Sequence, residues 1–109
     1  PASVDSLPTS GMQEDHVSLT WLAVRKLRKV IDNVRRILAV EYVCAARAID
    51  LRAPLQPSPA TDALRQRLRA EVAGCGPDRY LAPELQAAEE LLRVGALGDA
   101  LADLGITLE

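Results

Sequence analysis

The feature that most constrains this chain is the run from Met12 to Ala53, which contains neither glycine nor proline. All six glycines and all seven prolines lie outside this run, so nothing in its backbone forbids one continuous helix. A helix of about 35 residues is roughly 52 Å long, whereas a compact body of this chain length has a radius of gyration of about 13 Å. We therefore predict a long helix that extends beyond any globule the chain forms alone.

The middle of this helix, residues 37–46, is apolar around its whole circumference except for Glu41. A helix that is hydrophobic on all sides is a buried helix. The rest of the chain offers too few apolar residues to surround it, so we predict that helices from another chain, or from sequence outside this one, complete its cover. Apolar residues at spacings of three and four indicate one packing face, made of Leu27, Ile31, Val34, Leu38, Tyr42, Ala45 and Ile49.

Composition favours an all-α fold, because aromatic residues make up only 3% of the chain and β-branched residues do not alternate as a strand requires. We predict one long central helix plus two or three short helices, as part of a multi-helix bundle of a larger assembly. Ser58 before Pro59 is a typical N-cap and first helical position. The predicted segments are a loop of active-site type over 1–16, a long bundle helix over 17–52, a proline linker over 53–58 and short helices over 59–109.

The charge pattern does not favour a nucleic-acid partner. Residues 25–36 carry six basic side chains and one acid, and a basic helical stripe is one feature of nucleic-acid binding. These side chains fall on the side of the helix away from the apolar stripe, as on any solvated face, and the net charge of the chain is −2. Tyr42 and Tyr80 occupy apolar positions, so both are predicted to be core residues.

Cysteine use and hydropathy predict a cytoplasmic protein. Cys44 and Cys75 are two lone cysteines, which do not make a disulfide framework. Residues 1–11 lack the apolar core of a signal peptide, and no uncharged run approaches the roughly 20 residues that span a membrane. The chain opens on Pro-Ala-Ser without an initiator Met, which predicts a fragment or processed piece of a longer polypeptide.

The residues that carry chemistry are Gln13, Glu14, Asp15 and His16, where a loop meets the long helix. An amide, two carboxylates and an imidazole in this position can hold a general base, bind a charged substrate, or cap the helix, for which Asp15 or Ser18 is suited. We predict no metal site, because His16 has no second His or CxxC motif to complete one.

Several segments resemble the C-terminal portion of the aromatic amino acid lyase family, and its histidine ammonia-lyase branch most closely. The run from Pro1 to Leu19 is similar to the late signature segment of that family and is long and specific. Weaker matches follow in the same order and extend the resemblance over essentially the whole chain. They are Arg25 to Leu27, Asn33 to Arg36, Ala48 to Arg52, and Asp78 to Pro83.

The resemblance implies an all-helical homotetramer with a central bundle of long helices and active sites built from several subunits. It also implies a methylidene-imidazolone prosthetic group, formed from an internal Ala-Ser-Gly tripeptide, that activates the substrate for loss of ammonia. This chain contains no Ala-Ser-Gly. The group is therefore expected from elsewhere in the enzyme, either the rest of the lyase polypeptide or a companion chain, and this chain alone is expected to be inactive.

In the same resemblance, Glu14 matches the active-site carboxylate of the family, with a catalytic or substrate-binding role, and Gln13 matches the adjacent substrate-binding position. Aromatic relatives commonly carry an amide in place of Glu14, and a carboxylate accepts an imidazole N–H whereas a phenyl ring offers it no partner. Histidine is therefore the expected substrate and urocanate the product. His16 is expected to support the loop, and Met12 departs from the family pattern, in which Asn or another polar residue is usual.

Two alternatives remain open on the sequence. Because Met12 changes the lining next to Gln13, a tyrosine ammonia-lyase or an aminomutase of the same family is the first. The second is a non-catalytic helical fragment that only self-associates, through residues 37–46.

Overall fold

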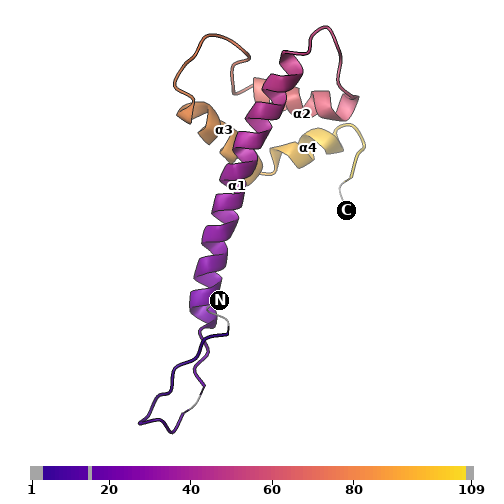
Figure 1. Ribbon diagram of the computed structural model, residues 1–109. Coiled ribbons are helices and arrows are strands. Elements are labelled where there is room, and N and C mark those ends of the chain that lie inside the picture. The colour runs from indigo at the N-terminus through magenta and orange to yellow at the C-terminus, as the bar shows by residue number, and fades with distance from the viewer. Residues whose placement is uncertain (1–3, 15, 108–109) are drawn as a thin grey trace. The chain divides into compact units, whose positions relative to one another are not determined.

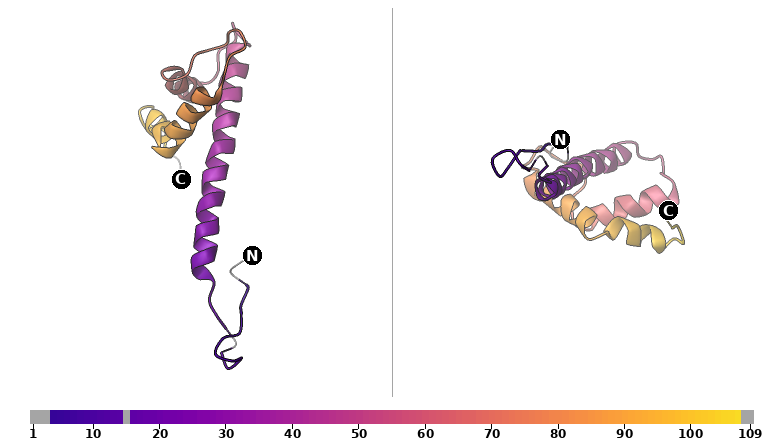
Figure 2. Two further views of the ribbon diagram at one scale, coloured as in Figure 1. Left: turned by 90° about the vertical axis from the view of Figure 1, so that its left-hand side faces the viewer. Right: turned by 90° about the horizontal axis from the view of Figure 1, so that it is seen from below.

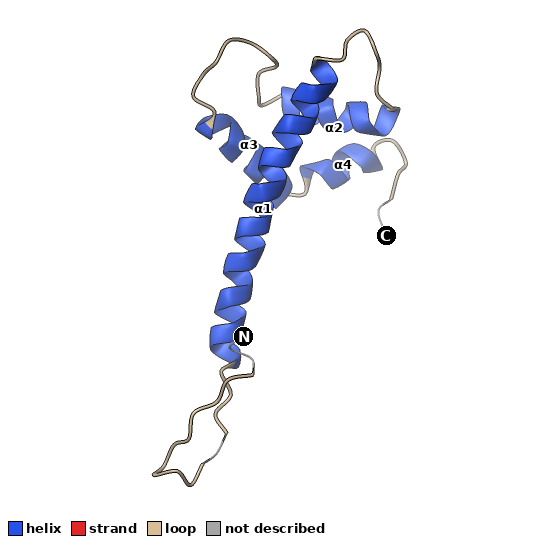
Figure 3. Cartoon of the chain, viewed as in Figure 1, coloured by secondary structure: helices blue, strands red, loops and turns tan. Residues whose placement is uncertain are grey.

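A computed structural model describes residues 4–14 and 16–107 of the chain. The described part contains four helices, α1 (Thr20–Asp50), α2 (Pro59–Arg69), α3 (Ala82–Arg93) and α4 (Ala96–Ala102) (Figure 1). It contains no strand, only one isolated bridge between Thr9 and Glu14 (Figure 3). The predicted all-α fold is confirmed. Asp15, and with it the capping role suggested for it, lies outside the described residues.

The chain divides into two compact units, one up to Val34 and one from Arg35 onward. The boundary falls within α1. The first unit holds the N-terminal loop and the beginning of α1. The second holds the rest of α1 together with α2, α3 and α4.

Helix α1 is shorter at both ends than the predicted range of 17–52. At its start, the hydroxyl of Ser18 contacts the hydroxyl of Thr20, so Ser18 does not cap the helix as suggested. At its end, the main-chain N–H of Arg52 donates to the carbonyl of Ile49 over 3.0 Å. This tighter turn precedes Pro54, which cannot continue a helix and disfavours helical backbone at the residue before it.

In the first unit, the apolar residues of α1 are exposed. Leu27 is 56% exposed, and Ile31 and Val34 are each 47% exposed. These three side chains belong to the predicted packing face, yet their own unit does not bury them.

The core of the second unit takes residues from all four helices. Leu68 of α2 and Val72, just beyond its end, are almost fully buried, at 0% and 1% exposure. Helix α4 lies against both α2 and α3 (Figures 1 and 2). From α1, the core takes Ala39, Val43 and Ala46, and alanine side chains let neighbouring helices approach closely. Ala88, Leu91 and Ala96 complete the cluster.

The apolar middle of α1 is therefore covered on one side only by this chain. Ala39 and Ala46 are buried, whereas Ile37 is 65% exposed and Val40 is 47% exposed. Cys44 is exposed as well, and it and Cys75 are free thiols. The chain thus leaves part of this apolar surface open, as the composition of the helix predicted.

Helix α2 begins where Ser58 and Pro59 predicted it would. The hydroxyl of Ser58 accepts a hydrogen bond from the main-chain N–H of Thr61 over 3.3 Å, and Pro59 begins α2. The predicted N-cap is confirmed. In the connection from α2 to α3, Arg79 pairs with Glu84 and donates to the carbonyl of Gly74 over 3.0 Å. Tyr80 is 81% exposed, so its prediction as a core residue was wrong, because this connection runs along the surface.

Tyr42 is half-buried, and its hydroxyl donates to the carbonyl of Leu64. Burial raises the pKa of its phenol above the ordinary value, so the folded protein keeps this proton to a higher pH than the unfolded chain does. The neutral Tyr42 phenol therefore stabilises the folded protein. This stabilisation is fully present below about pH 10, the ordinary pKa of tyrosine, and is lost as the pH rises through the higher pKa of the folded protein.

We predict that Tyr42→Phe lowers the free energy of unfolding by about 1 kcal/mol at pH 7, the usual worth of one hydrogen bond. The variant should also lose less stability than the unsubstituted protein between pH 9 and 11. Urea unfolding at each pH measures both effects. Tyr80→Phe, at an exposed position, is the matched control and should behave like the unsubstituted protein. Equal alkaline losses in all three proteins would contradict the prediction.

Candidate functional site

The predicted site residues lie on a tight hairpin. Thr9 and Glu14 pair through both main-chain groups, with N–H to carbonyl distances of 2.9 Å from Thr9 and 3.2 Å from Glu14. Inside this pair, the N–H of Gln13 donates to the carbonyl of Ser10 over 3.3 Å. The hairpin therefore fixes the backbone of Gln13 and Glu14 before any ligand binds.

The turn of this hairpin has an uncommon backbone. Ser10, Gly11 and Met12 are three consecutive residues with positive φ, at 52°, 65° and 71°. Glycine adopts this left-handed region freely, whereas each residue with a Cβ pays about 1–2 kcal/mol for it. Such backbone strain is frequent at functional sites, and here it lies directly before Gln13.

The Glu14 carboxylate is held at one oxygen. The hydroxyl of Thr9 donates to its Oε2 over 2.9 Å, and both side chains are exposed. An ionised carboxylate offers about four acceptor positions. Among the described residues, no other side chain forms a hydrogen bond or ion pair with this carboxylate, so Oε1 remains available to a donor such as an imidazole N–H. Gln13 is exposed beside it.

A hydrogen bond outside the hairpin joins the two ends of the N-terminal loop. The main-chain N–H of Val17 donates to the hydroxyl of Ser6 over 2.9 Å. His16, next to Val17, is exposed. The structure shows no hydrogen bond from its imidazole to any described residue, so its supporting role stays a prediction.

Sequence reasoning missed Thr9 and Ser6. Each is an ordinary hydroxyl residue in a loop, and its contact is with a residue several positions farther along the chain. Only the hairpin geometry shows these contacts, because no motif or spacing marks them in advance.

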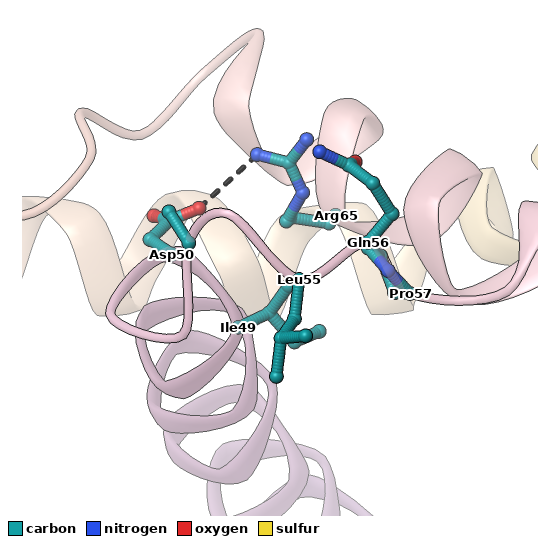
Figure 4. Close-up of a pocket in the computed structure, with 7 residues that line it drawn as sticks. Ile49, Asp50, Leu55, Gln56, Pro57 and Arg65 are labelled. Atoms are coloured by element: carbon teal, nitrogen blue, oxygen red, sulfur yellow. Dashed lines mark hydrogen bonds and ion pairs between the residues drawn. The ribbon is translucent and has the colours of Figure 1, made fainter.

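In the second unit, a hollow lies at the end of α1, lined by Ile49, Asp50, Ala53, Leu55, Gln56, Pro57 and Arg65 (Figure 4). Oδ1 of Asp50 lies 3.1 Å from Nη1 of Arg65, and Oδ2 of Asp50 lies 2.7 Å from Nη2 of Arg69. Both of its oxygens are therefore engaged by arginines of α2. This arrangement connects the end of α1 to α2, and we assign it a structural role.

Within residues 4–14 and 16–107, no helix combines the length and apolar character that crossing a membrane requires. In the same residues, no three His, Cys, Asp or Glu side chains lie where they could share a metal ion.

Comparison with known sequences identifies the family. The model for the family described as "Aromatic amino acid lyase" matches residues 1–70. This chain belongs to the aromatic amino acid lyase family. The match includes the hairpin, all of α1 and all of α2, so the candidate site lies within the part of the chain that the family shares.

Curated relatives in this family include two bacterial histidine ammonia-lyases. That of Streptomyces coelicolor is 55% identical over 98 residues, which are 89% of this chain and 19% of the relative. That of Vibrio cholerae is 53% identical over 94 residues, which are 86% of this chain and 18% of the relative. The chain thus spans about a fifth of the length of these relatives.

Solved structures of family members have the same fold over this region. The tyrosine aminomutase from Streptomyces globisporus superposes with a TM-score of 0.88 at 36% identity. The histidine ammonia-lyase from Trypanosoma cruzi gives the same TM-score and identity. In each case the match covers 94% of this chain and 20% of the other. The fold of the segment therefore does not separate lyases from aminomutases.

The positive φ of Met12 leads to a prediction about substitutions at this position. Asparagine adopts positive φ several-fold more readily than methionine, and a β-branched residue does so far less readily. We predict that Met12→Asn raises the exchange protection of the Glu14 main-chain N–H about several-fold, and that Met12→Val lowers it. Amide hydrogen exchange measured by NMR reports both. Faster exchange of this N–H in Met12→Asn than in the unsubstituted protein would contradict the left-handed conformation of Met12.

Proposed function

We propose that this chain is the C-terminal part of an ammonia-lyase that eliminates ammonia from L-histidine to give urocanate. The observation that carries the proposal is the exposed Glu14 carboxylate, whose Oε2 accepts from Thr9 and whose Oε1 has no hydrogen-bond donor among the described residues. The high identity to histidine ammonia-lyases over this region supports the same substrate.

The role of Glu14 follows from its chemistry. A carboxylate accepts the N–H of an imidazole ring in a charge-assisted hydrogen bond. In a closed site, a phenyl ring leaves that charge without a hydrogen-bond partner, at a substantial cost. Glu14 therefore binds and orients histidine in preference to its phenyl analogue, and Gln13 contributes an amide donor and acceptor beside it. With an acceptor oxygen open, the same carboxylate is also placed to take a proton.

The prosthetic group of the family must come from another part of the enzyme, because this sequence has no Ala-Ser-Gly. The residues present fit the substrate side of such a site, since an exposed carboxylate and an amide bind polar N–H groups. When bound, the methylidene-imidazolone supplies an electrophile that makes the substrate amine a better leaving group. The residues of this chain bind and orient the rest of the substrate.

The same proposal includes a homotetramer in the cytoplasm. Exposed apolar side chains on α1, such as Leu27 in the first unit and Ile37 in the second, have more than half of their surface open. Helices of the remaining lyase polypeptide and of neighbouring subunits would cover them, as in a central bundle. The two free thiols are compatible with a reducing compartment.

Turnover by the complete enzyme, assembled from this chain and the polypeptide that carries Ala-Ser-Gly, tests the function. We predict that Glu14→Ala lowers kcat/KM for L-histidine by roughly 10- to 100-fold, the worth of one hydrogen bond to a charged group. Urocanate absorbance measures the rate. Glu71→Ala is the matched control, because Glu71 is an exposed glutamate paired with Arg67, and it should leave kcat/KM unchanged.

Two results would replace the proposal. Turnover of L-tyrosine with none of L-histidine would favour the tyrosine ammonia-lyase or aminomutase, which the likeness to the Streptomyces globisporus enzyme keeps as the second candidate. An assembled enzyme that converts no amino acid would leave only the helical oligomerisation fragment.

A further inference from the structure

We propose that Thr9 is a positioning residue that sets the orientation of the Glu14 carboxylate for substrate. The inference rests on the proposed function, in that it takes Glu14 as the group that meets the substrate. It adds a residue outside the Gln13 to His16 stretch, five positions before Glu14 in the sequence.

Thr9 contacts Glu14 in two independent ways. Its main chain pairs with that of Glu14 in both directions, at 2.9 Å and 3.2 Å. Its hydroxyl, in addition, donates to Oε2 over 2.9 Å. The main-chain pair fixes the position of the Glu14 backbone, and the hydroxyl fixes the position of the Glu14 carboxylate.

The second contact matters because Glu14 is exposed. A glutamate has three side-chain torsions, and on an open surface it samples many rotamers. A hydrogen bond at Oε2 selects the rotamers that keep the carboxylate over the hairpin, with Oε1 turned to a ligand. Pre-organisation of this kind lowers the entropy that is lost when the substrate binds.

The competing explanation is that the hydroxyl only stabilises the hairpin. The two main-chain hydrogen bonds do not involve the hydroxyl, so Thr9→Val keeps them and removes only the contact to Oε2. Ser6→Ala does the reverse, because it removes the hydrogen bond from Val17 that closes the loop and leaves the Thr9 contact to Glu14 in place. The pair of variants separates orientation of the carboxylate from support of the loop.

The experiment uses the complete enzyme and two readouts, the affinity for urocanate by calorimetry and the steady-state constants for L-histidine. Thr9→Val should weaken urocanate binding and raise KM about tenfold, the lower end of what a hydrogen bond to a charged group contributes. It should change kcat by less than about twofold, since the hydroxyl acts on binding. Thr9→Ser keeps the hydroxyl and should restore the affinity to within about twofold of the unsubstituted enzyme.

Three outcomes would overturn the inference. The first is unchanged urocanate affinity in Thr9→Val. The second is an equal loss of affinity in Ser6→Ala, which would assign the effect to the loop. The third is a full further loss when Thr9→Val is added to Glu14→Ala, because a residue that acts through Glu14 has no effect once that carboxylate is gone.

Failure of the proposed function has a different signature. In that case the unsubstituted assembled enzyme itself neither converts L-histidine nor binds urocanate. If Glu14→Ala impairs both and Thr9→Val impairs neither, the function stands and only the role of Thr9 falls.

Discussion

The constraint on which the rest of this structure depends is the apolar surface of α1. In the second unit, α2 and its neighbours bury Ala39, Val43 and Ala46, but Ile37 and Val40 remain open. In the first unit, Leu27 and its apolar neighbours are open as well. Exposed apolar surface of this extent is typical of an interaction site and not of an isolated monomer. We therefore propose that other helices complete the cover of α1.

The hairpin before α1 has the opposite character, because it is polar, exposed and largely self-sufficient. Its hydrogen bonds join residues within the loop: Thr9 to Glu14, Ser10 to Gln13, and Ser6 to Val17. Its local strain is concentrated at the left-handed turn. A loop of this kind can present a carboxylate in a set geometry while the remainder of an active site comes from other parts of an assembly.

Much of the fold could be predicted because its signals are local. The glycine- and proline-free run predicts α1, and Ser58 before Pro59 predicts the start of α2, since each depends on a few adjacent residues. The exact ends of α1 were missed: the helix begins at Thr20 and ends at Asp50, before the turn that precedes Pro54. The face of α1 that packs within the second unit was also missed, because Ala39, Val43 and Ala46 lie beside the stripe of larger apolar residues on which the prediction rested.

The candidate site was predictable only in part. Gln13 and Glu14 were identified from a family resemblance together with the chemistry of a carboxylate at the junction of a loop and a helix. Thr9 could not be identified in this way, because its contact depends on three consecutive left-handed residues that close the turn. A single sequence does not reveal that conformation when two of the three residues are serine and methionine.

The most direct test of the central claim, that α1 requires partner helices, is sedimentation equilibrium of this chain over a range of concentrations. We predict association beyond a single chain at micromolar concentration. We also predict that Ile31→Glu dissociates the assembly, because it places a charge on the open apolar face, and that Lys29→Glu, on the basic side of the helix, has no effect. A folded monomer that sediments at the mass of one chain, with Ile31→Glu indistinguishable from the unsubstituted protein, would contradict it.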